Sequence, residues 1–421
     1  MSRVARLVER RRVKRNFSLL WFAQFVNTAG LMMLVPIMPL HMARLGVPED
    51  QVGLWAGVAV AAPALPLAIT TPMWGRPGDR VGRNWMVVRA LLGLAAAMAV
   101  MAAASGATVF VLGRLLQGTV GGVVEAAAAF VAADGDDEED RGAALGRSFS
   151  ATAAGSLVGP VAGGLLVGTS SLMYLMIGLA VVATALSAYG AVKLRGDTTA
   201  PSTGHTRSRP DNDARWASTI RRIHPPVLVA AFLAYLGVYG LIPVYPGLVE
   251  DLVADPRVVG PWVGGLHALM WAGTLLGSAW WGKRNDRRGS PLRTFMWAAL
   301  LTSAAIAVQA VTPHPLALAP SRFIQGWGFA ALAQSVVLHA SRSAPPALRG
   351  SHVGIANSFL LLGQFAGPLI AGALMMASPS QGVLVVFGAT VAAAAVMVRQ
   401  GATTRWVSVP TLDRVGVKSV N

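Results

Sequence analysis

The chain has 421 residues, of which 54% are hydrophobic and only 13% charged, and its mean hydropathy is +0.54. Soluble chains have about a quarter of their residues charged, so this composition indicates a membrane protein and excludes a soluble enzyme. The chain has no cysteine, which excludes disulfides, thiolate metal sites and a cysteine nucleophile. Its net charge of +16 indicates a nucleic-acid binder only if the basic residues share a soluble face.

Apolar segments long enough to cross a bilayer recur along the whole chain. Six lie at 17–43, 51–75, 84–105, 107–133, 144–168 and 171–192, and six more at 226–249, 260–282, 291–312, 314–341, 350–377 and 381–399. We therefore expect an all-α membrane protein with twelve transmembrane helices. Its expected parts are a basic cytoplasmic tail (1–16), a six-helix bundle (17–192), a cytoplasmic linker (193–225), a second six-helix bundle (226–399) and a cytoplasmic tail (400–421).

The basic residues follow this topology. With the N-terminus in the cytoplasm, 31 of the 35 Lys and Arg fall in cytoplasmic segments and two, Arg44 and Arg257, fall in outside loops. The other two, Arg114 and Arg322, lie inside predicted spans. Such an asymmetry is a strong positive-inside signal. It accounts for the net charge without a nucleic acid and predicts a multi-pass protein of the cell inner membrane with both termini cytoplasmic.

The two predicted bundles repeat one another at an offset of 207 or 208 residues. Matching elements include two prolines in the first span of each half, a glycine-rich charged loop, an Arg-x-x-Gln-Gly segment and a Gly-Pro pair. The matched starting positions are Pro36 and Pro243, Gly75 and Gly282, Arg114 and Arg322, and Gly159 and Gly367. Parallel repeats of this kind place a substrate site between the halves.

Three segments carry a resemblance to a known family. Gly75 to Arg83 reads GRPGDRVGR, Arg114 to Gly118 reads RLLQG, and Gly155 to Gly164 reads GSLVGPVAGG. They resemble the loop motif GxLADRxGR/K, the fourth-helix motif RxxQG and the fifth-helix motif GxxxGPxxGG of the major facilitator superfamily. Within it, the closest resemblance is to the 12-helix bacterial drug:proton antiporters. The resemblance covers about residues 17–399 and implies two pseudo-symmetric six-helix bundles (the major facilitator fold).

The loop between predicted spans 2 and 3 is a candidate cytoplasmic gate. Glycines at Gly75 and Gly82 allow a tight turn, and Asp79 can pair with Arg80 or Arg83. Asp134, at the end of span 4, can join this cluster. An ion-pair cluster there can hold the two halves in one state and release them in the other. The alternative is a solvated turn, since surface ion pairs contribute little.

Glu125 and Arg114 are the candidate proton-coupling pair. A guanidinium inside a span is costly and normally faces a bundle interior or a watery cavity, so Arg114 needs a partner. Glu125, on the same predicted helix face about 16 Å further along the axis, is the acidic residue deepest within any predicted span. We expect Glu125 to carry the proton and Arg114 to promote its release. A purely structural ion pair or hydrogen bond is the alternative.

The fifth-helix motif is the candidate antiporter element. Gly155, Gly159, Gly163 and Gly164 permit close approach of a neighbouring helix, and Pro160 removes a backbone donor. In the family this motif is characteristic of antiporters. The alternative is generic close packing.

Few other polar groups lie inside the predicted spans, and we expect them to line the substrate cavity. They are Gln24, Asn27, Tyr235, Tyr239, His267, Trp271, Arg322, Asn357 and Gln364. An apolar cavity with few polar groups suits a lipophilic substrate rather than a sugar, phosphate or carboxylate. For His267 and the aromatic residues, packing is the alternative role.

The expected function is export of hydrophobic small molecules, such as drugs or antibiotics, by proton antiport with alternating access. Alternatives are a dedicated exporter of one natural product or siderophore, an importer on the same fold, and, less favoured, a membrane-embedded enzyme. The sequence contains no HExxH, GxSxG or GxxxxGK[ST] motif. The expected partners are a lipophilic substrate, protons and the lipid bilayer, with no nucleic acid, cofactor or metal, and we expect a monomer.

Overall fold

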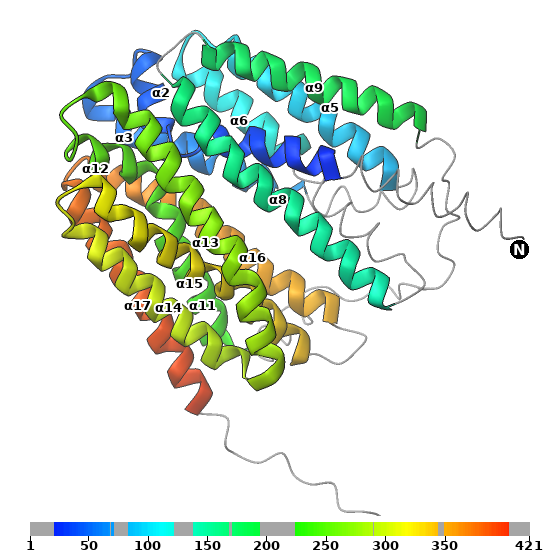
Figure 1. Ribbon diagram of the computed structural model, residues 1–421, viewed down its shortest axis with the longest axis vertical. Coiled ribbons are helices and arrows are strands. Elements are labelled where there is room, and N and C mark those ends of the chain that lie inside the picture. Colours follow the sequence, from blue (N-terminus) through cyan, green and yellow to red (C-terminus); the bar gives the residue numbers. More distant parts are fainter. Residues whose placement is uncertain are drawn as a thin grey trace, which may run out of the picture.

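The computed structural model describes residues 21–67, 69–70, 83–121, 138–167, 171–193, 224–288, 290–343 and 349–403, which form helices joined by turns. The helices contribute to two separate clusters of buried hydrophobic residues, one within residues 23–183 and the other within residues 228–398. Figure 1 shows the corresponding halves, with α8 and α13 between α9, α5 and α6 on one side and α14 and α17 on the other. Each half therefore has its own core.

In the first half, α5 packs against both α6 and α9. The helices of this half are Trp21–Leu34, α2 (Met38–Arg44), α3 (Glu49–Ala61), α5 (Arg83–Ala102), α6 (Ala107–Gly121), α8 (Glu138–Leu166) and α9 (Ser171–Lys193).

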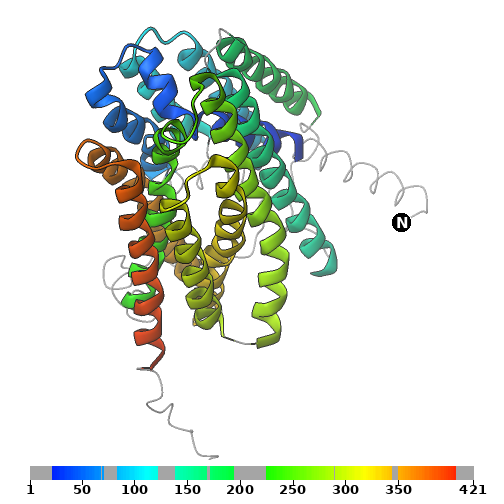
Figure 2. The same ribbon diagram turned by 60° about the vertical axis from the view of Figure 1, so that its left-hand side comes forward.

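In the second half, α13 packs against α15, α14 against α15 and α17, and α11 against α16 and α17. The helices are α11 (Pro225–Gly240), η2 (Ile242–Val244), α12 (Tyr245–Glu250), η3 (Pro256–Val258), α13 (Val259–Arg288), α14 (Pro291–Ala310), α15 (Pro315–Arg342), α16 (Arg349–Met375) and α17 (Ser380–Thr403). Figure 2 shows α17, in red, at the edge of this half.

Local sequence explains where several helices begin. A proline stands in the first turn of α14 and of α15, where its missing N–H costs no hydrogen bond. The residue before each proline caps the helix: the Ser290 hydroxyl accepts from the Arg293 N–H, and His314 Nδ1 accepts from the Leu316 N–H at 3.1 Å. These caps satisfy donors that a helix start would otherwise leave unpaired.

Prolines also stand where the first span of each half departs from a regular α-helix. The helix Trp21–Leu34 and α2 meet at 64°, and Pro36 and Pro39 stand at this junction. In the second half α11 passes through the 3₁₀ turn η2 into α12, with Pro243 and Pro246 at the matching positions. Because proline lacks an N–H and clashes with the preceding turn, it removes a helical hydrogen bond and favours an irregular turn at these positions.

Backbones of the two halves meet at one end of the molecule, which we call the closed end and which carries the α2–α3 connection at residues 45–48. There α3 packs against α16 and α8 against α13. A methyl group built at Gly57 would lie 2.3 Å from the carbonyl oxygen of Pro368, and one at Gly264 would lie 2.4 Å from that of Pro160. The two contacts correspond to one another in the repeat, because in each a glycine of one half packs against the proline-containing helix of the other half.

Five of the described helical segments are long and apolar enough to cross a membrane, or six if the bent pair in the first half counts as one span. Three further apolar helices, at Val87–Ala102, Ala107–Val120 and Ala151–Leu166, are shorter. The described residues thus confirm an all-helical membrane protein, while the count of twelve spans stays a prediction.

Candidate functional site: a cavity between the halves

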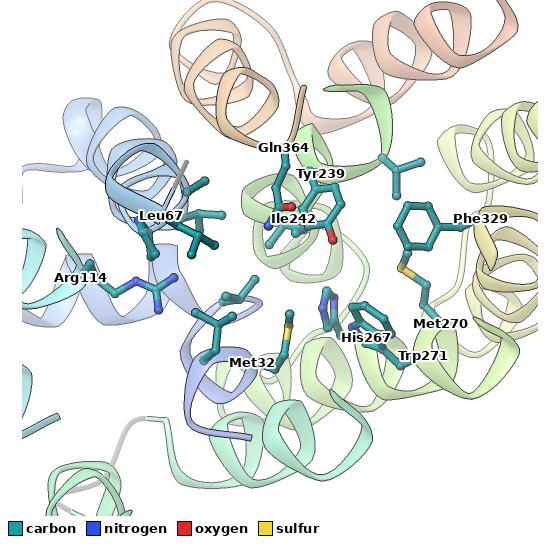
Figure 3. Close-up of a pocket in the computed structure, with 16 residues that line it drawn as sticks. Met32, Leu67, Arg114, Tyr239, Ile242, His267, Met270, Trp271, Phe329 and Gln364 are labelled. Carbon is teal, nitrogen blue, oxygen red and sulfur yellow. The ribbon is translucent and has the colours of Figure 1, made fainter. Parts of the chain in front are cut away.

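A cavity with about 660 Å³ of empty space, part of it open to solvent, lies between the two halves and is lined by α3, α6, α11, α13, α15 and α16 and by the helix Trp21–Leu34. Most lining side chains are aliphatic, methionine or aromatic, and the polar ones are Arg114, Tyr239, His267, Trp271 and Gln364. Figure 3 shows Arg114 on one side of the cavity and His267 and Trp271 on the opposite side.

Arg114, in α6, is fully buried and is held by two contacts within its own half. Its Nε donates to the carbonyl oxygen of Ala59 at 3.0 Å, and its Nη1 donates to Oε1 of Gln117 at 2.7 Å. Its Nη2 has no hydrogen-bond partner among the described residues. The two contacts fix the guanidinium in the cavity wall and leave the Nη2 nitrogen available to a ligand.

Arg322, the matching residue in α15, repeats two of these contacts. Its Nε donates to the carbonyl oxygen of Leu266 at 3.3 Å, and its Nη1 donates to Oε1 of Gln325 at 2.8 Å. Its Nη2, however, lies 3.3 Å from Nδ1 of His267. Because a guanidinium can only donate, Nδ1 must accept, which leaves the proton of a neutral imidazole on Nε2.

One substitution between the repeats explains this difference. The position that matches His267 in the first half is Val60, whose side chain cannot accept a hydrogen bond and also lines the cavity. Each of the three guanidinium nitrogens of Arg322 thus has a partner within its own half, whereas Nη2 of Arg114 has none among the described residues.

Arg322 also belongs to a buried polar network that sequence reasoning missed. Its guanidinium lies 3.9 Å from the centre of the Tyr245 ring. The Tyr245 hydroxyl donates to Gln309 and, at 3.2 Å, to Gln325, and Nε2 of Gln309 also donates to Gln325 at 3.2 Å. Gln325 follows Arg322 by three residues, a spacing that places both on one helix face, but Tyr245 and Gln309 come from distant elements.

Four of the predicted cavity residues line the cavity: Tyr239, His267, Trp271 and Gln364. Arg322 is not one of the lining residues but contacts one of them, His267. Tyr235 lies beside the cavity, with its ring centre 5.3 Å from those of both Tyr239 and Phe329.

The other three predicted cavity residues lie outside the set that lines it. Gln24 is buried and donates to the hydroxyl of Thr152 at 2.9 Å, which joins the first helix to α8. Asn27 is half-buried, and Asn357 in α16 is exposed.

The glycines of the predicted antiporter element lie at two helix contacts. Methyl groups built at Gly155, Gly159 and Gly163 would lie 2.7, 2.6 and 1.9 Å from backbone oxygens of the first helix. Gly164 faces α13, where a methyl group would lie 2.4 Å from a backbone oxygen. Pro160 stands inside α8, between these contacts. The motif therefore packs α8 against its own half and, at Gly164, against the other half.

The predicted proton carrier, Glu125, lies outside the described residues. So do most residues of the predicted cytoplasmic gate: Gly75, Asp79, Arg80, Gly82 and Asp134. Arg83 begins α5. Across the described part of the chain, no group of three or more His, Cys, Asp or Glu could hold a metal ion.

The family model that matches the chain is described as Major Facilitator Superfamily and covers residues 20–226 and 227–415. The staphyloferrin B transporter of Staphylococcus aureus is 35% identical over 374 residues, which are 86% of this chain and 86% of that protein. The multi-drug resistance efflux pump PmrA of Streptococcus pneumoniae is 26% identical over 364 residues, 86% of this chain and 89% of the pump. A crystal structure of the nucleoside transporter NupG shares the fold with a TM-score of 0.75 at 13% identity, covering 92% of this chain and 99% of that one.

Proposed function

The chain belongs to the Major Facilitator Superfamily, and we propose that it exports one polar small molecule, such as a siderophore, through alternating access of the cavity between its halves. As a member of this family it is a multi-pass membrane transporter and not an enzyme. The observation that carries the proposal is the 35% identity to a staphyloferrin B transporter over 86% of both chains, compared with 26% identity to the drug pump PmrA.

The geometry supports transport by alternating access. The cavity is bounded by both halves, so a change in their relative tilt alters access to it. Glycine contacts join the halves at the closed end, and Figure 1 shows α8 and α13 further apart toward their other ends. In transporters built from two repeats, rocking of one half against the other moves access from one side of the membrane to the other.

The positive-inside pattern supports placing both termini in the cytoplasm, which turns the closed end toward the outside. An exporter takes up its substrate in this state. We assign the driving force to proton entry, with Glu125 as the proton carrier and Arg114 as the fixed positive charge that promotes its deprotonation. Asp79, Arg80, Arg83 and Asp134 would form the cytoplasmic gate that closes in the opposite state.

Efflux of hydrophobic drugs is the second candidate. It is favoured by the apolar character of most of the cavity wall and by the more distant similarity to PmrA. The two candidates differ in breadth of substrate, because a dedicated exporter serves one molecule.

Deletion of the gene in its native host, grown with limiting iron, separates the two candidates. We expect the iron-chelating activity to fall in the medium and to rise in cell extracts, while growth in lipophilic antibiotics changes less than about twofold, the resolution of a dilution series. Restoration by the wild-type gene is the control. Unchanged secretion of chelator together with increased drug sensitivity would instead support drug efflux.

A further inference from the structure

Three buried donor groups on the cavity wall have no hydrogen-bond partner within the described part of the chain: Nη2 of Arg114, Nε2 of His267 and Nε1 of Trp271. The side chains of Arg114 and His267 are 0% and 3% exposed. They come from opposite halves, and Figure 3 shows them on facing sides of the cavity. Buried donors without partners are uncommon in proteins, since each loses its bond to water on burial.

Residues beside the cavity wall explain how these donors are held. Ala59 and Gln117 bind the other guanidinium nitrogens of Arg114, so Nη2 can donate to a ligand while the arginine keeps both of these contacts. Arg322 occupies Nδ1 of His267 and leaves its Nε2–H as a donor. Trp271, one turn after His267 on α13, can only donate through its ring nitrogen.

The electrostatic character of the wall agrees with this set of donors. Arg114 brings a positive charge, and none of the described residues that line the cavity is Asp or Glu. Among these described residues, a cationic ligand would meet a positive charge and three donors, with no carboxylate to pair with it. An anionic ligand with several oxygen acceptors would satisfy all of them, and a guanidinium N–H forms its strongest hydrogen bonds with carboxylates.

We propose that this cavity binds an anionic, oxygen-rich ligand of the carboxylate class, with Arg114 contacting it from the first half and His267 and Trp271 donating from the second. The apolar remainder of the wall holds the ligand's hydrocarbon part. This inference rests on the proposed export function and narrows its substrate class: it disfavours cationic drugs and favours a molecule that presents carboxylate oxygens.

Direct binding to the purified full-length protein in detergent tests this inference without any gradient. The probes are 2-naphthoate, its neutral counterpart 2-naphthamide and the cation 2-naphthyl-trimethylammonium, which share one ring system and differ in charge. Isothermal titration should show naphthoate binding at least about tenfold more tightly than either of the others, because a hydrogen bond to a charged group is worth more than a neutral one. Naphthoate binding no tighter than naphthamide binding overturns the proposal.

Variants locate the site. Arg114→Gln should weaken naphthoate binding about tenfold or more and leave naphthamide within about threefold. Because Arg114 also supports its own half, Trp271→Phe provides a second test that keeps an aromatic side chain and removes one donor; it should weaken naphthoate binding severalfold. The matched controls are Arg293→Gln and Trp297→Phe, two exposed positions of α14.

Equal naphthoate affinity in Trp271→Phe, in a folded Arg114→Gln protein and in the controls would overturn the assignment of these residues. Chelator secretion by the deletion strain is measured independently, so an absence of export and an absence of anion preference are separate outcomes. Loss of secretion with no preference for naphthoate would leave the proposed function standing and remove the carboxylate inference.

Discussion

The surroundings of Arg114 show what a sequence can predict about a buried charge. The cost of a guanidinium inside a span predicts that Arg114 needs a partner, and Glu125 is the partner that the sequence offers. Glu125 lies outside the described residues, so this pairing stays a prediction. Within the described residues, the guanidinium is held by Gln117, three residues later, and by the carbonyl oxygen of Ala59. The i,i+3 spacing made the first contact predictable, whereas a backbone carbonyl 55 positions earlier leaves no signal in the sequence.

The comparison of His267 with Val60 also shows a contact that the sequence does not reveal. The repeat offset pairs these two positions, but the role of His267 depends on its contact with Arg322, which lies on a separate helix. Tyr245 and Gln309 were missed for the same reason, since 64 positions separate them and neither belongs to a periodic motif.

Glu125 is the residue on which the proposed proton coupling depends. Glu125→Gln removes the proton-carrying group while keeping the side chain's size, so it should abolish transport that an imposed pH gradient drives in proteoliposomes. Ligand binding in detergent should persist. Transport at the wild-type rate by the variant would make Glu125 a structural residue and would transfer the coupling role to Asp79, Asp134 or His267.

At the scale of helices, glycines decide how closely neighbours approach. Gly118 in α6 and its repeat mate Gly326 in α15 lie against backbone oxygens of Pro63 and Met270, where built methyl groups would lie at 2.1 and 1.9 Å. The repeat predicted that these positions correspond. It could not predict their neighbours, because a glycine in a span is compatible with lipid contact, a bend or a helix crossing.

Gly118→Val should destabilise the first half, because the added side chain would clash with backbone atoms of Pro63, which cannot move aside as a side chain can. Overpacking of this kind typically costs about 1–3 kcal/mol. The thermal midpoint of the detergent-solubilised protein should fall relative to wild type. Gly178→Val is the matched control, since a methyl group built at Gly178 meets no atom within 4 Å. Equal midpoints for the two variants would show that the α6 contact tolerates more volume than its geometry implies.

Gly264→Ala should act on conformation. Its added methyl group would lie 2.4 Å from the carbonyl oxygen of Pro160, so it should push α8 and α13 apart. We therefore expect it to favour the opposite state of the transporter, in which the halves separate at the end that carries residues 45–48. The chain has no cysteine, so a single cysteine in place of Val35 in the cavity wall reports access cleanly. A membrane-impermeant thiol reagent should label this cysteine faster in Gly264→Ala than in the Gly265→Ala control, whose added methyl group meets no atom within 4 Å. Equal labelling rates would argue against the α8–α13 contact as a gate.

For the whole molecule, composition and the repeat predicted an all-helical membrane protein with two matching halves, and the separate hydrophobic clusters agree. The bend at Pro36 was not predicted as a break in the first span, because proline is tolerated within transmembrane helices and its effect depends on the neighbours that satisfy the freed carbonyls. The substrate was the least predictable feature. An apolar wall favoured lipophilic drugs, and its three unpaired donors become visible only when both halves are assembled.

The proposed function requires alternating access of the central cavity, and distances between paired spin labels test this motion most directly. One pair, at Glu49 and Ser378, spans the closed end; the other, at Val192 and Arg293, spans the opposite end, and all four positions are in described helices or turns. Electron–electron distance measurements in nanodiscs, made in acidic and neutral buffer with and without 2-naphthoate, should show one distance lengthening as the other shortens. Two distances that stay fixed, or that change in the same direction, would contradict the account.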